Sequence, residues 1–454
     1  MGNAALGGKY TAYPEYKNSG EEWLGKVPNH WKVIQIKHLS SVKRGASPRP
    51  IDDPKYFDED GEYVWTRIAD VTASDVYLTK APQRLSDLGS SLSVKLEPES
   101  LFLSIAGTVG KPCITGMKAC IHDGFVYFPE LKIPSKFLFY VFSGEQAYKG
   151  LGKFGTQLNL NTDTVGGIKI GCTENEELEK IVNFLDHETA KIDTLIEKQQ
   201  QLIALLKEKR QAVISHAVTK GLNPDAPMRD SGVVWLGELP EHWGACRVKQ
   251  VSNFITSGPR GWSDFLSDNG KDIFLQSGDL NYKLGLELCN AKKVSPPKNA
   301  EGVRTKLECG DVVVCITGAN TGRVAITPRL SETVYINQHL SLIRPIKELL
   351  DSDYLGFMLS SISVKAYFSV TQYGLKEGLS LSNVAEAPLC RPPLDEQREI
   401  AQYVKRASNK YDTLEYVAEK QVGLLLERRT ALISAAVTGK IDVRDFNPKD
   451  AEAC

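Results

Sequence analysis

Two glycine-rich loops carry the residues whose types and spacing point most directly to chemistry. Gly107-Thr-Val-Gly-Lys111 and Gly318-Ala-Asn-Thr-Gly-Arg323 each follow an apolar, strand-like run and end in a cation. Glycine lets a backbone approach a ligand closely, and a cation at that place can contact a phosphate or a guanine edge. A plain tight turn with a solvated cation explains either loop alone equally well. The recurrence of the pattern keeps the binding role open.

The first loop has the outline of a nucleotide-binding loop but does not satisfy its pattern. A Walker A loop reads Gly-x-x-x-x-Gly-Lys-Ser/Thr, because its amides cradle phosphates and its hydroxyl holds Mg²⁺. Here Ile105 occupies the first glycine position before Gly110, and Pro112 replaces the hydroxyl residue. The second loop ends in Arg323 and has no lysine. The sequence therefore argues against nucleotide binding.

Other polar residues that match DNA base edges lie in loops near the predicted strands. The donors and acceptors of Arg, Lys, Asn and Gln fit the major groove. Taken singly, each is an ordinary surface residue, because such side chains are mostly exposed. The candidate DNA-binding residues of the first half are Lys43, Arg44, Ser47, Arg49, Thr66, Arg67, Thr108, Lys111, Gln157, Asn159 and Asn161. Those of the second half are Ser257, Arg260, Gln276, Ser277, Asn320, Thr321, Arg323, Asn337, Gln338, Tyr373 and Lys376.

Spacings typical of catalytic or metal sites are missing from the sequence. It contains no His-x-x-x-His, His-Glu-x-x-His or Gly-x-Ser-x-Gly pattern, and no Asp/Asn-Pro-Pro-Tyr/Phe signature of adenine methyltransferases. The paired carboxylates Asp52 and Asp53 lie in a charged turn typical of a solvated surface. We therefore expect no catalytic residue, no metal site and no cofactor in this chain.

Composition and net charge limit the binding partners and the cellular compartment that we expect for this protein. The net charge of −1 produces no global attraction to DNA or to an anionic membrane, so any basic surface must be local or come from a partner. Nine cysteines, an odd number without a Cys-x-x-Cys pair, indicate a reducing compartment. No apolar run is long enough to span a membrane. We expect a cytoplasmic protein that binds no membrane.

The elements that must position these residues occur twice. Trp23-Leu-Gly-Lys-Val-Pro-Asn-His-Trp31 returns as Trp235-Leu-Gly-Glu-Leu-Pro-Glu-His-Trp243, and Leu206-Lys-Glu-Lys-Arg210 returns as Leu425-Leu-Glu-Arg-Arg429. Two copies of one unit therefore fill the 454 residues. Such a chain can fold with an approximate two-fold axis and meet two copies of a partner or two halves of a target.

Each copy begins with a mixed α/β domain. Short apolar runs bounded by Gly, Pro, Asp and Ser predict strands, and two longer runs predict a helix packed on the sheet. The predicted strands include Tyr63–Trp65, Leu101–Ile105, Gly124–Phe128 and Gly167–Ile170, and the predicted helices are Pro134–Phe142 and Asp353–Leu359.

Each copy ends in a long helix with a coiled-coil pattern. Apolar residues step by three and four over about five heptads, which is typical of a helix pair. Thr173–Glu176 predicts a capping box, and Gly221 and Gly439 predict the helix ends. Gln199 and Gln421 predict either a buried polar pair that fixes register or two exposed glutamines. The predicted seam residues are Ile181, Leu185, Ile192, Leu195, Gln199, Leu202, Leu206, Val213, Ile400, Val404, Tyr411, Leu414, Gln421, Leu425 and Leu432.

These patterns predict an α+β fold. Two mixed α/β domains are expected to be joined by two long antiparallel coiled-coil helices with pseudo-two-fold symmetry. The predicted boundaries are an N-terminal segment 1–27, a first domain 28–175, a first helix 176–220, a linker 221–239, a second domain 240–393, a second helix 394–438 and a C-terminal tail 439–454.

The repeated motifs give the chain a family resemblance over nearly its whole length. Arg391-Pro-Pro-Leu-Asp-Glu-Gln397, followed by Ile400-Ala401 and a long helix that ends Ala435-Ala-Val-Thr-Gly-Lys440, resembles the conserved region of type I restriction-modification specificity subunits. The Trp-Leu-Gly-x-x-Pro-x-His-Trp motif is similar to the domain openings of that family. One departure is that the first copy has Cys172-Thr-Glu-Asn-Glu-Glu177 in place of the Pro-Pro-Leu opening.

The resemblance implies a division of labour among several proteins. Each domain would read one half of a split, asymmetric double-stranded DNA site, and the helices would set the spacer and dock two methyltransferase subunits. Those partners would bind S-adenosylmethionine and methylate adenine, and restriction motor-nuclease subunits would use ATP and Mg. This chain would be a non-catalytic specificity subunit.

Two other functions remain open on the sequence. A non-catalytic coiled-coil scaffold that binds proteins rather than DNA predicts no basic patch, whereas clustering of Arg44, Arg49, Arg67 and Lys111 on one surface favours DNA. An enzyme with an unrecognised site, such as a nuclease, predicts clustered Asp, Glu and Lys with metal dependence.

Overall fold

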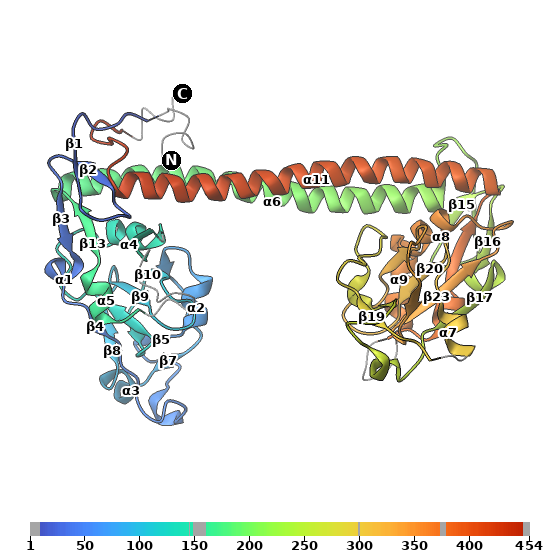
Figure 1. Ribbon diagram of the computed structural model, residues 1–454, viewed down its shortest axis with the longest axis horizontal. Helices are drawn as coiled ribbons and strands as arrows, with labels where there is room; N and C mark the ends of the chain where they lie inside the picture. Colours follow the sequence, from blue (N-terminus) through green and yellow to red (C-terminus); the bar gives the residue numbers. More distant parts are fainter. Residues whose placement is uncertain (1–9, 145, 149–159, 298–299, 373–377, 448–454) are drawn as a thin grey trace. The chain divides into compact units, whose positions relative to one another are not determined.

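The chain divides into two compact units that share both long helices. The computed structural model describes residues 10–144, 146–148, 160–297, 300–372 and 378–447. Unit 1 comprises Met1–Gln200 and Lys420–Cys454, and unit 2 comprises Gln201–Glu419. Each unit contains one mixed α/β domain and half of each long helix, α6 (Asn175–Lys220) and α11 (Leu394–Val437) (Figure 1). The division therefore runs through the helices, whereas the sequence led us to treat each helix as a separate element.

Unit 1 contains two main sheets. One has the strand order β4-β12-β9-β10-β6 and the other β7-β5-β11-β8, while β1-β2 and β3-β13 form two-stranded ladders. The strands are β1 (Tyr16–Asn18), β2 (Lys26–Pro28), β3 (Lys32–Gln35), β4 (Lys43–Arg44), β5 (Tyr63–Thr66), β6 (Tyr77–Leu78), β7 (Arg84–Leu85), β8 (Val94–Leu96), β9 (Leu101–Ser104), β10 (Pro112–Thr115), β11 (Ala119–Ile121), β12 (Phe125–Tyr127) and β13 (Lys169–Cys172).

Helix α4 connects the sheet of unit 1 to the long helices. It is apolar almost all round, as expected of a helix buried on every side, and Phe137 and Leu138 join one core cluster with Leu185 of α6 and Leu432 of α11. The predicted strand at Gly167–Ile170 is displaced, because α5 extends through Gly167 before β13 begins. The short helices are α1 (Ile36–Leu39), η1 (Pro54–Tyr56), α2 (Ile68–Ala73), α3 (Asp87–Ser91), α4 (Ser135–Ser143), η2 (Gln146–Tyr148) and α5 (Thr162–Gly167).

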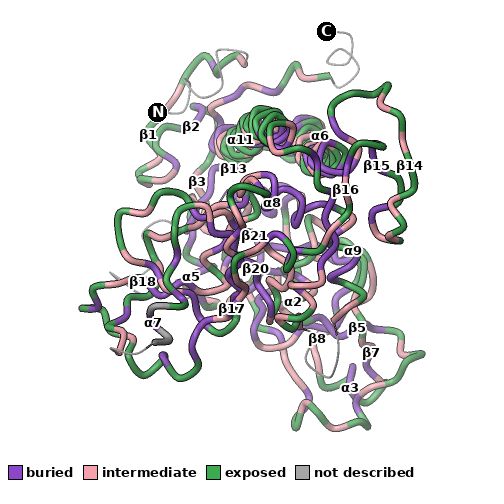
Figure 2. The backbone as a smooth tube through the Cα atoms, turned by 90° about the vertical axis from the view of Figure 1, so that its right-hand side faces the viewer, coloured by how far each residue is buried: buried purple, intermediate pink, exposed green. Residues whose placement is uncertain are grey.

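Unit 2 repeats this topology. The order β17-β23-β20-β21 matches β4-β12-β9-β10, and β19-β18-β22 matches β7-β5-β11. In Figure 2 the traces of β20 and β21 are largely purple, the colour of buried residues. The strands are β14 (Met228–Asp230), β15 (Glu238–Pro240), β16 (Gly244–Arg247), β17 (Ser252–Ser257), β18 (Asp272–Leu275), β19 (Lys292–Val294), β20 (Val312–Cys315), β21 (Val324–Ile326), β22 (Val334–Ile336), β23 (Leu340–Pro345) and β24 (Pro388–Arg391).

Helix α8 of unit 2 occupies the place of α4, because α8 packs on β20 and β21 as α4 packs on β9 and β10. The α8 segment is buried along its whole second half, and the Tyr354 hydroxyl lies 3.0 Å from the carbonyl oxygens of both Val218 and Cys390, which share its single proton. This tyrosine therefore links α8 and β24 to the end of α6. The short helices are η3 (Val248–Gln250), η4 (Trp262–Phe265), η5 (Ser277–Asp279), α7 (Ala300–Thr305), α8 (Ser352–Leu359), α9 (Ile362–Thr371) and α10 (Leu381–Ala385).

The long helices pair antiparallel in unit 1, with a seam shifted from the predicted one. Leu195 is 48% exposed, whereas Ile196 is half-buried and packs on the hydrophobic cluster that includes residues of both helices. Gln199 is half-buried and Gln421 exposed, so the structure does not bury a glutamine pair. The other predicted seam residues here are buried or half-buried, namely Ile181, Leu185, Ile192, Leu425 and Leu432.

The same one-residue shift occurs in unit 2. Leu202 and Leu414 are 42% and 43% exposed, and Ile203 and Glu415 lie inward instead. Glu415 is buried because its carboxylate accepts a hydrogen bond from Tyr282 at 3.1 Å and pairs with Lys207 at 3.2 Å. The remaining predicted seam residues are buried or half-buried, namely Leu206, Val213, Ile400, Val404 and Tyr411.

In unit 1 the repeated tryptophan motif holds the start of one long helix and the end of the other. Trp31 Nε1 donates to Glu177 Oε1 at 3.0 Å, and His30 Nε2 lies 2.8 Å from Glu177 Oε2. Gly439 follows α11 with φ of +68°, and a Cβ there would lie 3.3 Å from the Trp31 ring. The indole therefore packs against the end of α11 while it anchors the first turn of α6.

Unit 2 builds the same arrangement with the helices exchanged. Trp243 Nε1 donates to Glu396 Oε2 at 3.1 Å, and His242 Nε2 lies 2.9 Å from that atom. Gly221 follows α6 with φ of +78°, and a Cβ there would lie 3.2 Å from the Trp243 ring. We refer to each arrangement of histidine, tryptophan and glutamate as a Trp–Glu clasp.

The clasp of unit 1 has additional donors. Glu177 also accepts hydrogen bonds from the Tyr13 hydroxyl at 2.7 Å and from the Thr173 hydroxyl at 2.9 Å. Burial alone would raise the pKa of Glu177, but the hydrogen bonds outweigh it and hold the pKa below its ordinary value. This contact replaces the predicted capping box, because α6 begins at Asn175 and the Thr173 hydroxyl donates to the side chain of Glu177.

Candidate functional site

The predicted DNA-reading residues gather where pairs of parallel strands end. β5 pairs in parallel with β11, and β18 pairs in parallel with β22. Arg67 and His122 therefore lie side by side directly after the ends of β5 and β11. Gln276 and Asn337 lie in the same way directly after the ends of β18 and β22. The carboxyl ends of parallel strands are the usual place for ligands in α/β sheets. In each unit this edge brings together polar side chains from distant parts of the chain.

A second loop packs on this edge through a glycine in each unit. A Cβ at Gly45 would lie 2.2 Å from the carbonyl oxygen of His122, and a Cβ at Gly258 would lie 2.1 Å from that of Ile336. Only glycine permits so close an approach. The loops after β4 and β17 are therefore seated on the strand edge, with the predicted residues Lys43, Arg44, Ser47 and Arg49 in unit 1 and Ser257 and Arg260 in unit 2.

The glycine-rich loops complete both assemblies. Ile105 N donates to Gly124 O at 2.8 Å, and Ile316 N donates to His339 O at 2.9 Å. Each loop therefore joins the strand edge at the same point in the fold. We define the loop cluster of unit 1 as residues 44–49, 67, 105–111 and 122–124, and that of unit 2 as residues 257–260, 276–279, 316–323 and 337–339.

The cations that end the glycine-rich loops hold neighbouring backbone. Lys111 Nζ donates to Thr72 O, and Arg323 Nη1 donates to Leu280 O, each at 2.8 Å. Thr108 and Thr72 also share a hydrogen bond between their hydroxyl groups at 2.8 Å. These cations thus fix the loops to the elements after β5 and β18, a structural role that the sequence did not predict, and the contact with a phosphate or a guanine edge stays a prediction.

Exposed positive charge gathers in the cluster of unit 1. Arg44 and Arg49 lie 3.9 Å and 3.7 Å from the same carboxylate, Asp123, and Ser47 donates a hydrogen bond to that residue at 3.3 Å. The arginine side chains are 59% and 83% exposed. Ion pairs so exposed add little stability. Two cations on one carboxylate leave net positive charge, as expected of a surface that approaches phosphates.

His122 supplies a neutral donor in the same cluster. Its Nδ1 accepts a hydrogen bond from Gly124 N at 2.8 Å, and its ring lies 4.5 Å from that of Phe125 and 5.9 Å from that of Trp65. Burial lowers the pKa of His122, and Asp123 only partly offsets this. A neutral imidazole with Nδ1 as acceptor carries its proton on Nε2.

In unit 2 some predicted residues support the loops and others face solvent. Asn320 Nδ2 donates to Ser277 O at 3.0 Å, and Thr321 Oγ1 donates to Gly318 O at 2.6 Å. These two side chains therefore brace the glycine-rich loop. Arg260 and Gln338 are exposed, so their donors and acceptors remain accessible to a ligand.

Three predicted residues do not belong to an exposed reading surface. Asn337 is 5% exposed, and its side-chain oxygen accepts a hydrogen bond from His339 N at 3.0 Å. Thr66 is fully buried, and among the described residues its hydroxyl has no hydrogen-bond partner. Asn161 caps α5, since its side chain accepts from Asp163 N at 3.0 Å and Thr164 N at 2.8 Å. Four further predicted residues lie outside the described part of the chain, namely Gln157, Asn159, Tyr373 and Lys376.

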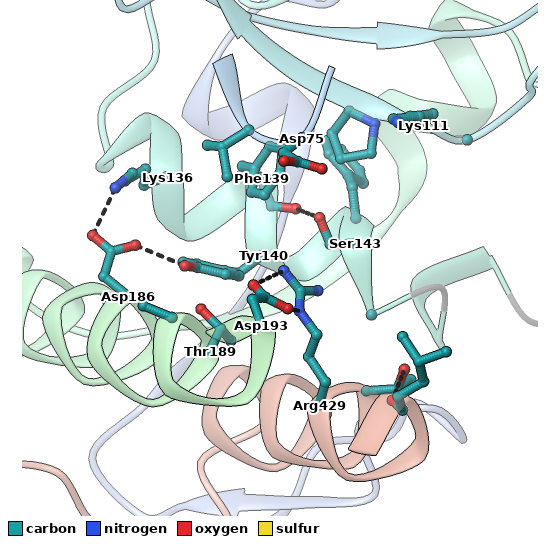
Figure 3. Close-up of a pocket in the computed structure, with 18 of the residues that line it drawn as sticks. Asp75, Lys111, Lys136, Phe139, Tyr140, Ser143, Asp186, Thr189, Asp193 and Arg429 are labelled. Atoms are coloured by element: carbon teal, nitrogen blue, oxygen red, sulfur yellow. Dashed lines mark hydrogen bonds and ion pairs between the residues drawn. The ribbon is translucent and has the colours of Figure 1, made fainter. Parts of the chain in front are cut away.

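A groove of about 1390 Å³ lies in unit 1 between the glycine-rich loop, α4 and the long helices (Figure 3). Asp186 accepts from Lys136 Nζ at 2.6 Å and from the Tyr140 hydroxyl at 2.7 Å, and Arg429 Nε donates to Asp193 at 2.8 Å. Burial alone would lower the pKa of Lys136, but Asp186 raises it above its ordinary value. The groove thus carries paired charges of both signs.

Several residues of the loop clusters were not predicted from the sequence. Asp123 and His339 follow strands and have no local pattern of their own. Gly45 and Gly258 do carry a recognisable feature, because Arg44-Gly-Ala-Ser-Pro-Arg49 and Ser257-Gly-Pro-Arg260 both place Pro-Arg shortly after the glycine. That shared pattern marks the corresponding loops in the two copies.

Neither metal chemistry nor a membrane segment is indicated by the part of the chain that the structure describes. Within those residues, His, Cys, Asp and Glu form no group that could hold a metal ion. The described helices include none with the length and apolarity needed to cross a membrane.

Comparisons with known proteins agree with this architecture. The family described as "Type I restriction modification DNA specificity domain" matches residues 28–205 and 240–422. The type I restriction enzyme MjaVIII specificity subunit of Methanocaldococcus jannaschii is 22% identical over 438 residues, covering 93% of this chain and 95% of that protein. The EcoDI specificity subunit of Escherichia coli is 22% identical over 417 residues, covering 89% and 86%.

A solved structure supports the fold independently. A chain from a study of complex assembly and conformational transition in a type I R-M system superposes with a TM-score of 0.68 at 15% identity. The match covers 90% of this chain and 98% of that chain. Because the family matches most of the sequence in two separate segments, one in each copy, this chain belongs to the type I restriction-modification DNA specificity family.

Proposed function

We propose that each α/β domain of this chain reads one half of a split, asymmetric site in double-stranded DNA. The observation that carries the proposal is that one loop cluster is built twice on the same strand order with different side chains. Arg67 and His122 stand in unit 1 where Gln276 and Asn337 stand in unit 2. A constant scaffold with variable readers suits a protein that recognises two different half-sites.

The chemistry of the two clusters predicts different base preferences. Arginine pairs best with the O6 and N7 acceptors of guanine, and Asn and Gln pair best with the N6 and N7 groups of adenine. Unit 1 offers Arg44, Arg49 and Arg67, whereas unit 2 offers Arg260 together with the amides Gln276 and Gln338. We therefore propose that unit 1 favours guanine contacts and unit 2 adenine contacts.

We further propose that the long helices set the spacer and dock two methyltransferase subunits. In unit 1, Leu424 and Leu426 of α11 are 49% and 50% exposed, and in unit 2, Leu205 of α6 is 48% and Tyr416 of α11 is 63% exposed. Exposed apolar stretches of this kind mark protein interfaces. In Figure 2, which views both long helices end-on, their coils are largely green, the colour of exposed residues.

The catalytic work in this proposal belongs to the partners. The methyltransferase subunits bind S-adenosylmethionine and methylate adenine, and the restriction motor-nuclease subunits use ATP and Mg. This chain supplies neither a catalytic residue nor a cofactor.

Single-molecule sequencing of genomic adenine methylation tests the proposal. A host that expresses this chain with its neighbouring methyltransferase gene should gain a split methylated motif that disappears without this chain. Arg67→Ala should relax or change only one half of the motif, and Gln276→Ala only the other half. A change in both halves from one substitution, or none from either, would contradict the assignment of one half-site to each unit.

A protein-binding scaffold is the alternative that this experiment separates. It predicts a stable complex with the methyltransferase but no new methylated motif. The docking proposal is tested by Leu205→Glu, which should weaken capture of the methyltransferase, with Ala212→Glu at an exposed neutral position of the same helix as the charge-matched control. Equal capture by both variants would contradict docking at Leu205.

A further inference from the structure

A second pocket, in unit 2, differs in charge from the groove of unit 1. It has a volume of about 350 Å³ and lies between the glycine-rich loop, α9 and the last part of α6. Among the described residues that line it, the charged side chains are Arg210, Arg323 and Lys365, and none is acidic. The uncharged polar lining residues are Gln211, Asn281, Tyr282, Asn320, Thr321, Ser360, Ser369 and Gln372.

Arg210 is buried and only partly neutralised. Its Nε lies 3.3 Å from Asp412 Oδ1, but neither atom has a hydrogen-bond partner among the described residues. Asp412 also lies 3.7 Å from Lys283, so one carboxylate is shared by two cations. The Arg210 guanidinium therefore brings positive charge to the pocket, and Asp412 does not fully balance that charge.

Lys365 and Arg323 bond to neutral oxygen atoms. Lys365 Nζ donates to Gln211 Oε1 at 2.7 Å, and Arg323 donates to the carbonyl oxygen of Leu280. Partial desolvation at the wall of the pocket lowers the pKa of Lys365, and the positive charge of Arg210 lowers it further. Bringing cations together in this way costs free energy, which an anion in the pocket would offset.

We propose that this cation pocket, formed by Arg210, Arg323 and Lys365, binds a backbone phosphate of the DNA beside the half-site read by unit 2. The inference rests on the proposed function and deepens it. The glycine-rich loop lines the pocket and also belongs to the loop cluster of unit 2. Asn320 of this loop lines the pocket and donates a hydrogen bond to Ser277 O of the cluster. A duplex on the cluster would therefore present its backbone next to the pocket.

The corresponding groove in unit 1 is not expected to do the same. It also contains the cation of its glycine-rich loop and the arginine of its long helix, but four carboxylates line it, whereas Asp412, the partner of Arg210, does not line the pocket of unit 2. Its charged lining residues are Lys111, Lys136, Arg429, Asp75, Asp186, Asp193 and Glu197. The phosphate contact is therefore assigned to unit 2 alone.

The test is the salt dependence of DNA binding by the assembled complex of this chain with its methyltransferase. Each phosphate contact contributes about 0.9 to the slope of log K against log salt concentration. Lys365 is exposed, so Lys365→Gln should leave the fold intact, lower the slope by about 0.9 and weaken binding to a cognate and a scrambled duplex by the same factor. Lys365→Arg should restore the slope.

Lys249→Gln is the matched control, because Lys249 lies in the same unit and pairs with Glu386 outside the pocket. It removes one positive charge and should leave the slope unchanged. Arg210 is a poorer target, because its removal leaves Asp412 without its nearest cation on α6.

Several outcomes would overturn the inference. One is an unchanged slope in Lys365→Gln, another is an equal fall in the control, and a third is weakened capture of the methyltransferase with normal DNA binding, which would identify a protein contact. Inorganic phosphate that binds the wild-type complex and is not displaced by DNA would identify a site for free anions. Failure of the wild-type complex to bind any duplex would instead refute the proposed function.

Discussion

The two Trp–Glu clasps allow one substitution to be compared at two places in the same chain. Glu177→Ala removes the acceptor of two buried donors, since Trp31 is 0% and Tyr13 3% exposed. A buried donor left without an acceptor costs about 1–3 kcal/mol. The free energy of opening unit 1 should therefore fall by roughly 2–6 kcal/mol, taking both donors together.

The same change in unit 2 should cost less. Glu396→Ala leaves one buried donor, the indole N–H of Trp243, without an acceptor. Trp243 is 1% exposed, whereas the more exposed His242 can bond to water. We expect a loss of roughly 1–3 kcal/mol. Both glutamates lie in the first turn of a long helix, so changes in helix propensity and helix-dipole interaction are similar and largely cancel in the comparison.

Hydrogen exchange measured by mass spectrometry gives the loss for each unit separately. Peptides that contain β13 report on the clasp of unit 1, and peptides that contain β24 report on that of unit 2. The larger gain in exchange should be confined to β13 in Glu177→Ala. Equal losses in the two variants, or a larger loss in Glu396→Ala, would refute the reasoning that buried donors set the energy of the clasp.

Three further predictions follow from the same structure. The folded-state pKa of Glu177 lies below its unfolded value. The stabilisation by this carboxylate is therefore complete above the ordinary glutamate pKa of about 4.3 and is lost as the pH falls through the lower folded value. Glu177→Ala should flatten this loss of stability at low pH in profiles of unfolding free energy against pH. Arg344→Met should destabilise unit 2 by roughly 3–5 kcal/mol in urea unfolding, because Asp311, 1% exposed and bonded at 2.8 Å and 2.7 Å, would be left unpaired; a loss below about 1 kcal/mol, the range of exposed pairs, would contradict this. Thr66→Val should leave DNA binding unchanged and thermal stability equal or higher, since the buried hydroxyl has no partner among the described residues; a weakened affinity would restore Thr66 as a reading residue.

The sequence predicted the long helices but not the phase of their seam. Leu195-Ile196 and Leu202-Ile203 are adjacent apolar pairs, so either member fits a spacing of three and four. At 414–415 the apolar residue was the natural choice, yet Glu415 lies inward because Lys207 and Tyr282 bond it. Contacts with other elements set the phase of the seam, and the spacing of apolar residues along one helix does not reveal those contacts.

The loop clusters were predictable only in part. Residue types identified many of their members, including Arg44, Arg67 and Gln276. Their assembly depends on parallel pairing between β5 and β11 and between β18 and β22, which joins strands far apart in the sequence. The Trp-Leu-Gly-x-x-Pro-x-His-Trp motif was evident as a repeat, but its role as a clasp requires the glutamate supplied by each long helix.

The contact between each domain and its long helix shows how the copies diverged. In unit 1, Lys136 of α4 pairs with Asp186 of α6, whereas in unit 2 Asp353 of α8 pairs with Lys405 of α11. The geometry is kept while the charges are exchanged. Both members of each pair come from one copy of the repeat, so an exchange within one copy leaves the other undisturbed.

Pairs between the two long helices keep their polarity instead. Arg429 pairs with Asp193 in unit 1, and Arg210 pairs with Asp412 in unit 2, so each pair takes one residue from each copy. A domain moved into the other unit with its own helix therefore retains its contact, whereas residues 28–172 moved alone would place Lys136 against Lys405. Such a chimera should unfold at a lower temperature than the same chimera with Lys136→Asp. Equal unfolding temperatures would show that the exchanged charges do not match each domain to its own helix.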